Sequence, residues 1–197
     1  MKKFYYNFSG YGIFILPPWP IKLKVNGYRE ECCKLFGLRK ALIPPVHITL
    51  GHLFNFIPEQ ENYLIKTIRA YSRSMVPFEQ HLDNFGSFKS HTVFIKASQN
   101  RNIAELNYVS TYIAGSKKKS YQFNGKINSF QPHLSIAHRA LTEELYPSVW
   151  EEYKDKAFEA EFTVNNFTLV KWNADTYKWD NLHHFPLEGS KPLTLFT

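Results

Sequence analysis

The chain has 197 residues, of which 44% are hydrophobic and 17% aromatic, which excludes a disordered protein and allows one domain or two small lobes. No segment reaches the roughly 18 apolar residues of a membrane span, and the N-terminal segment lacks the uniform apolar run of a signal peptide, so no membrane association is expected. The formal charge of +7 favours a polyanionic or phosphorylated partner, although many proteins carry such a charge without binding nucleic acid.

The N-terminal part of the chain predicts two strands and two helices. A short apolar run at 12–16 ends at two prolines and is typical of a buried strand. Charged residues on one side and apolar residues on the other predict a helix over 28–38. Two further prolines precede a run rich in β-branched residues at 46–50, which predicts the second strand. A proline and two acidic residues predict the first turn of a helix over about 58–74.

The middle of the chain predicts a hairpin followed by a helix. Strands are expected at 78–82 and 91–97, joined through a turn at 84–90. Apolar residues recur at helical spacing over 101–114, which predicts the third helix. The segment 115–120 contains the only tight cluster of lysines and is expected to be a solvated loop.

The C-terminal part predicts a third proline-led strand, a helix and a last hairpin. The strand covers 133–136 and directly follows a proline. The helix begins near Thr142, which could cap it, or near Pro147, and ends near Lys156. Aromatic alternation then predicts two long strands whose turn lies at 173–175, and these strands cover 158–170 and 177–187.

This order of elements predicts an α+β protein with mixed or antiparallel sheets and helices on the outside. No long linker divides the chain, so residues 1–197 are expected to form a single domain. Each half of the chain enters a histidine-containing strand after a proline and continues with a helix and two strands. That repetition predicts two pseudo-repeated lobes.

The strongest chemical signal is a pair of His–apolar–Ser/Thr–apolar tetrapeptides that begin at His47 and His133. Successive side chains of a strand point to opposite faces, so His47 and Thr49 share one face, as do His133 and Ser135. Two such strands across a groove would present two imidazoles and two hydroxyls to one pocket. Taken alone, either histidine is more readily explained as a packed structural residue, and it is the matched pair that favours catalysis.

These residue types suit phosphodiester chemistry. A neutral histidine can take a proton from the attacking oxygen while a protonated histidine gives one to the leaving oxygen. The hydroxyls of Thr49 and Ser135 can donate hydrogen bonds to the phosphate oxygens on which charge accumulates. Which of His47 and His133 is the base depends on the direction of attack and is left open.

The two tetrapeptides and the surrounding order of elements resemble the two-histidine (2H) phosphoesterases, the superfamily of 2′-5′ RNA ligases and cyclic phosphodiesterases. The resemblance spans residues 12–187 and implies a two-lobed fold of duplicated sheets with a central cleft. It implies catalytic roles for His47 and His133, phosphate binding by Thr49 and Ser135, and 2′,3′-cyclic phosphates or 2′-5′ phosphodiesters as substrates. No metal or other cofactor is implied.

Other side chains are weaker candidates. His52 and His138 each lie five residues after a motif histidine, but that spacing places them on the opposite face of a strand, so a metal site is not expected. Contacts to the substrate could come from a basic or aromatic group near the motifs: His91, Arg139, Phe88, Tyr121 and Phe130.

Two alternatives to an RNA or nucleotide phosphodiesterase stay open. The first is an RNA-binding module with the same fold and no turnover, and the second is a hydrolase of a small cyclic phosphate such as ADP-ribose 1″,2″-cyclic phosphate. The only cysteines, Cys32 and Cys33, are adjacent and unsuited to pairing with each other, which favours a reduced cytoplasmic setting. No obligate protein partner is evident.

Overall fold

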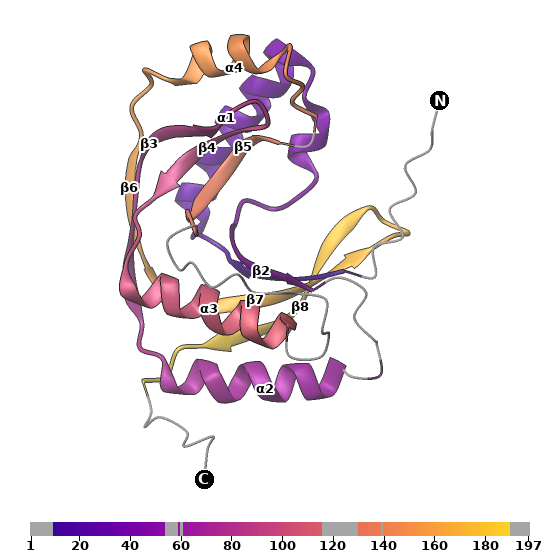
Figure 1. Ribbon diagram of the computed structural model, residues 1–197, viewed down its shortest axis with the longest axis vertical. Coiled ribbons are helices and arrows are strands. Elements are labelled where there is room, and N and C mark those ends of the chain that lie inside the picture. Colours follow the sequence, from indigo (N-terminus) through magenta and orange to yellow (C-terminus); the bar gives the residue numbers. More distant parts are fainter. Residues whose placement is uncertain (1–9, 54–58, 60, 116–129, 139, 190–197) are drawn as a thin grey trace.

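The computed structural model describes residues 10–53, 59, 61–115, 130–138 and 140–189, and over these residues eight strands form one sheet (Figure 1). Every neighbouring pair in the sheet is antiparallel. The strands are β1 (Tyr11–Ile15), β2 (Ile48–Leu53), β3 (Phe78–Phe88), β4 (Thr92–Ala97), β5 (His133–His138), β6 (Glu159–Val164), β7 (Asn166–Asn173) and β8 (Lys178–Pro186). The helices are α1 (Trp19–Phe36), the 3-10 helix η1 (Arg39–Leu42), α2 (Glu61–Ser74), α3 (Arg101–Gly115) and α4 (Tyr146–Tyr153).

The sheet consists of two four-stranded halves that meet at one point. The spatial order is β6-β3-β4-β5-β2-β1-β7-β8. At the centre, β2 and β5 share a single pair of residues, Ile48 and Leu134. The strands β2, β1, β7 and β8 are called here the first half-sheet, and β5, β4, β3 and β6 the second half-sheet. This α+β arrangement of two joined halves confirms the predicted fold class.

The helices divide between the two half-sheets, as Figure 1 shows, with α2 and α3 at one end of the molecule and α1 and α4 at the other. Contacts join α3 to β2 and α2 to β8 on the first half-sheet, and α1 to β5 and α4 to β4 on the second. Among the described helices, none combines the length and the apolar composition needed to cross a membrane.

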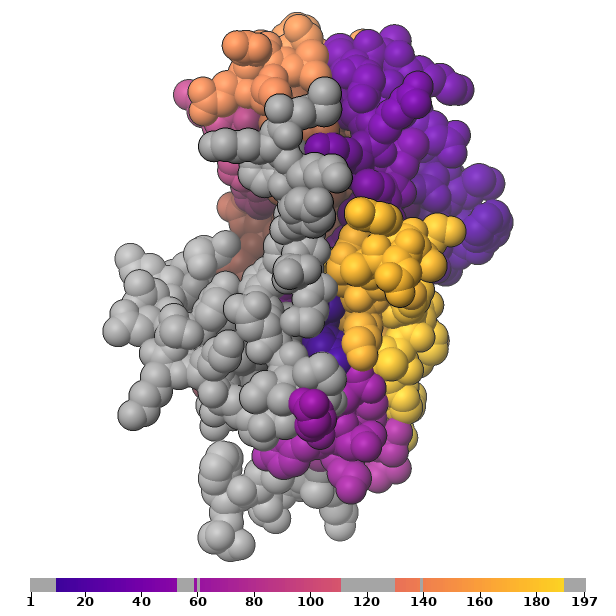
Figure 2. All heavy atoms as spheres, turned by 90° about the vertical axis from the view of Figure 1, so that its right-hand side faces the viewer, coloured from indigo at the N-terminus to yellow at the C-terminus, as the bar shows by residue number. Residues whose placement is uncertain are grey.

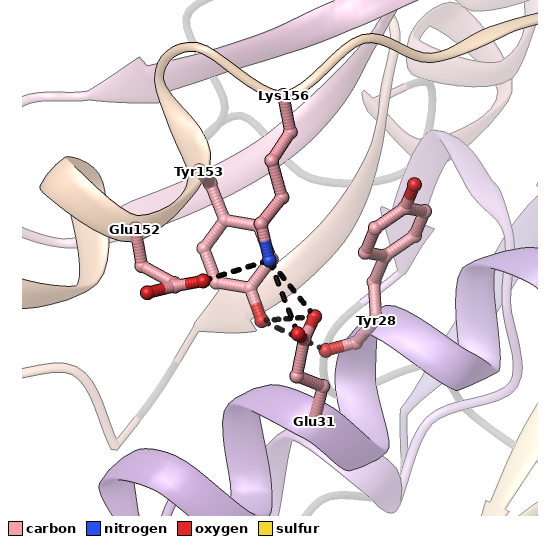
Figure 3. Close-up of polar contacts among 5 residues, drawn as sticks. All are labelled: Tyr28, Glu31, Glu152, Tyr153 and Lys156. Carbon is pink, nitrogen blue, oxygen red and sulfur yellow. Dashed lines mark hydrogen bonds and ion pairs between the residues drawn. The ribbon is translucent and has the colours of Figure 1, made fainter.

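Helix α1 is fastened to the end of α4 by a polar cluster (Figure 3). The Lys156 ammonium donates to both carboxylate oxygens of Glu31 at 3.1 Å and forms an ion pair with Glu152 at 2.8 Å. It also lies 4.7 Å from the ring centroid of Tyr153, whose hydroxyl donates to the Tyr28 carbonyl at 3.1 Å. These contacts therefore fix the position of α1 relative to α4 on the second half-sheet.

The segment predicted as one strand over 158–170 is two strands, β6 and β7, separated at Asn165. They lie at opposite ends of the sheet, because β6 pairs with β3 whereas β7 pairs with β1 and β8. The exposed pair Asn165 and Asn166 marks the crossing, where the buried positions change from every second residue in β6 to four consecutive residues in β7. The hairpin of β7 and β8, from the end of the chain, completes the half-sheet that begins with β1.

Two further predictions of element bounds were wrong. Helix α1 begins at Trp19 and not at 28, because Pro20 occupies the first turn, where a missing N–H costs nothing. Strand β3 continues through the predicted turn to Phe88. Asn84 in this strand has a φ of 51° at a register shift, which explains why its neighbourhood reads as a turn.

Thr142, the predicted helix cap, forms its hydrogen bond in the turn that precedes the helix. The hydroxyl of Thr142 accepts a hydrogen bond from the Leu145 N–H at 3.2 Å, and α4 itself begins at Tyr146 with Pro147 in its first turn. Helices α2 and α3 lie where the sequence predicts them. The predicted loop at 115–120 lies almost wholly outside the described residues.

Candidate active site

The two histidine tetrapeptides line one cavity of about 310 Å³ between the half-sheets. His47 immediately precedes β2, and His133 is the first residue of β5. Extending the antiparallel Ile48–Leu134 pair by one residue in each direction places His47 opposite Ser135 and His133 opposite Thr49. All four of these side chains line the cavity, so the structure brings together the residues that the sequence pairs.

The cavity is enclosed by segments that are far apart in the sequence. Its described lining residues are Phe14, Arg29, Lys40, Ala41, Pro44, Pro45, His47, Thr49, His52, Phe88, His91, Thr92, His133, Ser135, Ile136, His138 and Trp179. Figure 2 shows the β7–β8 hairpin, which carries Trp179, directly below the α1–η1 segment, which carries Arg29 and Lys40.

Each motif histidine is oriented by the same short backbone contact. The Nδ1 of His47 lies 2.7 Å from the carbonyl oxygen of Pro45, and the Nδ1 of His133 lies 2.7 Å from that of Gln131. A carbonyl only accepts, so in both rings Nδ1 carries the hydrogen. In the neutral ring Nε2 then holds the lone pair, which makes it the atom that can accept or return a proton.

The prediction that His52 and His138 point away from the motif histidines was wrong. In β2, Phe14 and Ile13 pair with Thr49 and Gly51, which leaves Leu50 as an extra residue. A β-bulge of this kind shifts the alternation of all later side chains by one position. His52 therefore lines the cavity together with His47.

Strand β5 repeats this device at the equivalent position. Phe94 and Val93 pair with Ser135 and Ala137, so Ile136 is the extra residue and His138 also lines the cavity. Over the described part of the chain, however, no three histidine, cysteine or acidic side chains cluster closely enough to hold a metal ion.

An aromatic ring packs against each motif histidine. Phe14 stacks on His47 with ring centroids 3.8 Å apart, and Phe94 lies 4.7 Å from His133. The two phenylalanines occupy equivalent places, because Phe14 pairs with Thr49 and Phe94 with Ser135. These contacts remove water from one side of each imidazole.

A glycine makes room for each of these rings. A Cβ atom on Gly12 would lie 2.6 Å from the ring of Phe14, and one on Gly86 would lie 2.8 Å from the ring of Phe94. Both distances are shorter than any normal contact, so no larger residue fits without moving the ring.

The two imidazoles differ in their electrostatic surroundings. The pKa of His47 is lowered from 6.5 to about 3, mainly by burial and to a smaller extent by the charges of His52, Arg29 and His133, while the Pro45 carbonyl acts in the opposite direction. Burial also lowers the pKa of His133, where the Gln131 carbonyl opposes it. Both histidines are therefore neutral at pH 7 in the ligand-free protein.

The charges that line the cavity favour an anionic ligand. Its described lining includes two basic side chains, Arg29 and Lys40, and five histidines, and no carboxylate. Arg29 is 3% exposed and forms no ion pair with any described acidic residue. Its desolvation lowers its pKa to about 10, so it remains charged near neutrality.

The weaker candidates from the sequence have different outcomes. Phe88 and His91 line the cavity, with Phe88 at 5.0 Å from the ring of His133 and His91 hydrogen-bonded to the Thr92 hydroxyl at 2.9 Å. Phe130 packs against the hydrophobic core and is not among the lining residues. Tyr121 and Arg139 lie outside the described residues.

Sequence reasoning overlooked several lining groups, among them Phe14, Arg29, Lys40, Thr92 and Trp179. Phe14 belongs to a uniformly apolar run that reads as core. Arg29 is an arginine on a charged helix, and such residues are usually solvated. Trp179 follows an exposed hairpin turn, and its ring reaches the cavity beside that of Phe14, with ring centroids 5.5 Å apart.

Known proteins resemble this chain over most of its length. The family model of the 2′-5′ RNA ligase superfamily matches residues 17–176. A protein of Bacillus cytotoxicus is 28% identical over 91% of this chain and 98% of its own length, and one of Geobacillus kaustophilus is 29% identical over 92% and 98%. Both carry the name “Putative phosphoesterase”.

Two solved structures share the fold. The protein TT0787 of Thermus thermophilus aligns with a TM-score of 0.68 at 17% identity, over 91% of this chain and 98% of its own. Escherichia coli LigT complexed with 3′-AMP aligns with a TM-score of 0.64 at 20% identity, over 92% and 99%. The matched family model covers well over half of the sequence, and the chain therefore belongs to the 2′-5′ RNA ligase superfamily.

Proposed function

We propose that this protein is a phosphodiesterase that acts, without a metal ion, on 2′,3′-cyclic phosphates or 2′-5′ phosphodiester bonds of RNA or nucleotides. The observation that carries the proposal is the convergence of His47, Thr49, His133 and Ser135 on one cavity. The family membership and the phosphoesterase names of the relatives in Bacillus and Geobacillus support the reaction class.

In the proposed reaction, one imidazole accepts a proton through Nε2 from a water molecule as its oxygen attacks the phosphorus. The other imidazole, protonated in the complex with the substrate, donates its proton to the ribose oxygen that leaves. One P–O bond forms and one breaks, and the proton moves from the water to the leaving alcohol through the two histidines. In the antiparallel register between β2 and β5 the two histidines lie diagonally across the strand pair, an arrangement that would let them flank a bound phosphate.

The hydroxyls of Thr49 and Ser135 complete the proposed site. Each lies opposite the histidine of the other strand, so each hydroxyl can donate to a non-bridging oxygen while the histidines act on the oxygens in line. The bound phosphate raises the proton affinity of the nearby imidazoles, which supplies the protonated member of the pair. Arg29 and Lys40 favour a negatively charged substrate.

The preference for a nucleotide over a small cyclic phosphate rests on the aromatic lining. Phe88 and Trp179 approach the cavity from opposite half-sheets, and aromatic side chains can stack on a nucleobase. One structure of the related Escherichia coli LigT is a complex with 3′-AMP. A hydrolase of ADP-ribose 1″,2″-cyclic phosphate would use the same four central residues and differ only in these flanking contacts.

The test is product analysis with the four nucleoside 2′,3′-cyclic monophosphates, a 2′-5′ dinucleotide and ADP-ribose 1″,2″-cyclic phosphate, each with EDTA present. The double variant His47→Ala/His133→Ala is the matched control. Turnover of a nucleotide by the wild type and not by the variant is the expected result. Salt-sensitive binding of RNA by both proteins with no turnover of any substrate would contradict the proposal and favour a binding module.

A further inference from the structure

A row of aromatic rings leads from His47 to the turn of the β7–β8 hairpin. Trp179 lies beside Phe14, the ring that stacks on His47, with centroids 5.5 Å apart. Trp172 lies 5.5 Å from Trp179, and Tyr177 lies 6.2 Å from Trp172. The three rings of the hairpin, Trp179, Trp172 and Tyr177, are called here the aromatic strip.

The register of the first half-sheet places the aromatic strip on the face that carries the cavity. Trp172 and Trp179 are paired directly across β7 and β8, so their side chains leave the sheet on the same side. Trp179 lines the cavity. Lys171, the neighbour of Trp172, points to the opposite face and binds Glu61 of α2 at 3.0 Å. The aromatic strip is therefore continuous with the candidate active site.

The aromatic strip becomes more exposed with distance from the cavity. Trp179 and Trp172 are half-buried, whereas Tyr177 is 69% exposed. Figure 1 shows the tip of the β7–β8 hairpin projecting from the body of the sheet. The described hydrophobic core includes none of the three side chains. Packing of the core thus does not account for three large aromatic residues at this place.

Tyr177 occupies a backbone conformation that a tyrosine seldom adopts. Its φ is 54°, in the left-handed region that favours glycine and asparagine. The side chain of Asn173 fixes this turn, because its Oδ1 accepts from the N–H groups of Asp175 and Thr176 at 3.0 and 3.1 Å. The turn therefore holds an exposed ring in a strained conformation, which is typical of a residue that serves binding rather than folding.

A basic segment borders the cavity opposite the aromatic strip. Lys40 of η1 lines the cavity, and Arg39 next to it is exposed. In Figure 2 the β7–β8 hairpin lies directly below this segment. Single-stranded nucleic acids bind where cations follow the phosphates and aromatic rings stack on successive bases. The two borders of the cavity together offer both kinds of contact.

We propose that the aromatic strip is a stacking surface for the bases next to the reacting phosphate, so that the preferred substrate is the end of a single-stranded oligonucleotide and not a mononucleotide. This inference rests on the proposed function and names its substrate class. Trp179 takes the base of the nucleotide that carries the reacting phosphate, and Trp172 and Tyr177 take the bases beyond it. Because every base has a face on which a ring can stack, the sequence of the oligonucleotide matters little.

The experiment compares substrates of one to four nucleotides that all end in a 2′,3′-cyclic phosphate. For the wild type, kcat/KM should rise about tenfold for each further base that stacks, mainly through a lower KM, because stacking stabilises the ground state and the transition state alike. Trp172→Ala and Tyr177→Ala should each reduce the ratio of kcat/KM between the tetranucleotide and the mononucleotide about tenfold. A ratio that stays at the wild-type value in both variants would overturn the proposal.

Two further variants are matched controls. Tyr177→Phe keeps the ring and should keep the ratio. Tyr63→Ala removes an equally exposed tyrosine from α2, on the opposite face of the half-sheet, and should also keep it. A ratio that falls as much in either control as in Tyr177→Ala would contradict stacking on the aromatic strip.

Tyr177→Asn separates binding from stability. Asparagine adopts a positive φ more readily than tyrosine does, so this variant should unfold at the same urea concentration as the wild type or at a higher one. It should nevertheless reduce the ratio as Tyr177→Ala does. A stable Tyr177→Asn protein with the wild-type ratio would show that the ring has no part in binding.

A second readout does not depend on turnover. Oligonucleotides of the same lengths that end in a 3′-phosphate can be titrated by calorimetry, and Kd should fall with length in the wild type but less so in Trp172→Ala and Tyr177→Ala. Binding that depends on length without turnover would support the stacking surface and contradict the proposed reaction, whereas turnover and binding that do not depend on length would do the reverse. A wild-type dimer that Tyr177→Ala converts to a monomer, as measured by analytical ultracentrifugation, would identify the aromatic strip as a contact between two copies and overturn the inference.

Discussion

The His47 and His133 regions are built from the same parts and are held in place differently. In both, the imidazole donates to the carbonyl two residues earlier, a phenylalanine packs on the ring, and a β-bulge lies three residues later. Before His133, the carbonyl of Pro132 accepts from the backbone N–H of Ala97 in the neighbouring strand, at 3.1 Å. Before His47, the corresponding segment is held by the side chain of Arg29.

The comparison shows how a repeated motif can be fixed in place by different contacts. The residues before His133 are held by a backbone hydrogen bond from β4, whereas those before His47 are held by a charged side chain from α1. The two halves of the molecule therefore fix equivalent segments by different means.

The largest effect is expected from the histidines themselves. His47→Ala and His133→Ala should each lower kcat about 10²–10⁴-fold, the usual range for one acid–base group. The effects should not add in the double variant, because the two groups act in one step. Steady-state kinetics with circular dichroism as a check on folding measures this, and a single variant with full activity would rule out the pair.

The hydroxyls should have a smaller and more equal effect. Thr49→Val and Ser135→Ala each remove one donor to the phosphate oxygens and should lower kcat about 10²-fold with little change in KM. Thr49→Ser, which keeps the donor, is the matched control. A rise in KM with an unchanged kcat would instead indicate that these hydroxyls bind the ground state and the transition state equally.

The glycines test whether the two halves are built alike. Gly12→Ala and Gly86→Ala should each displace the ring of Phe14 or Phe94 and destabilise the fold by about 1–3 kcal/mol, the usual cost of overpacking. Urea denaturation measures this cost. Gly27→Ala, where nothing lies within 4 Å of the added methyl group, should not destabilise the protein.

The last effect concerns the dependence of stability on pH. The pKa of His47 is lowered in the folded protein, so below about pH 6.5 the unfolded chain binds more protons than the native one. The free energy of unfolding should therefore fall as the pH drops from 6.5 towards 4. His47→Gln should weaken this dependence, and an unchanged slope would mean that His47 does not remain neutral in the native state.

The sequence was sufficient to predict that His47, Thr49, His133 and Ser135 face one cavity, because a strand fixes which side chains share a face over two positions. It failed for His52 and His138, since a single extra residue at Leu50 or Ile136 reverses the alternation. A bulge depends on the partner strand, and no local preference reveals it. Arg29 was missed for a similar reason, because only the packing of α1 on β5 brings it to the cavity.

The fold class was predictable because prolines and the change from helical to alternating periodicity mark most elements. The position of the last hairpin was not, because the two exposed residues at the break, Asn165 and Asn166, do not indicate to which edge of the sheet the next strand goes. Whether a strand continues beside its predecessor or crosses to the far edge of a sheet depends on which edge is vacant, and this is a property of the whole molecule.

The crossing at Asn165 also has a consequence for the order of events during synthesis. Strand β1 is translated first among the described strands, but one of its two partners, β7, follows only after β2 to β6. The half-sheet that positions His47 must therefore wait for residues 166–186. We expect nascent chains that lack this hairpin to be inactive, so the protein would gain its chemistry only after this hairpin has been translated.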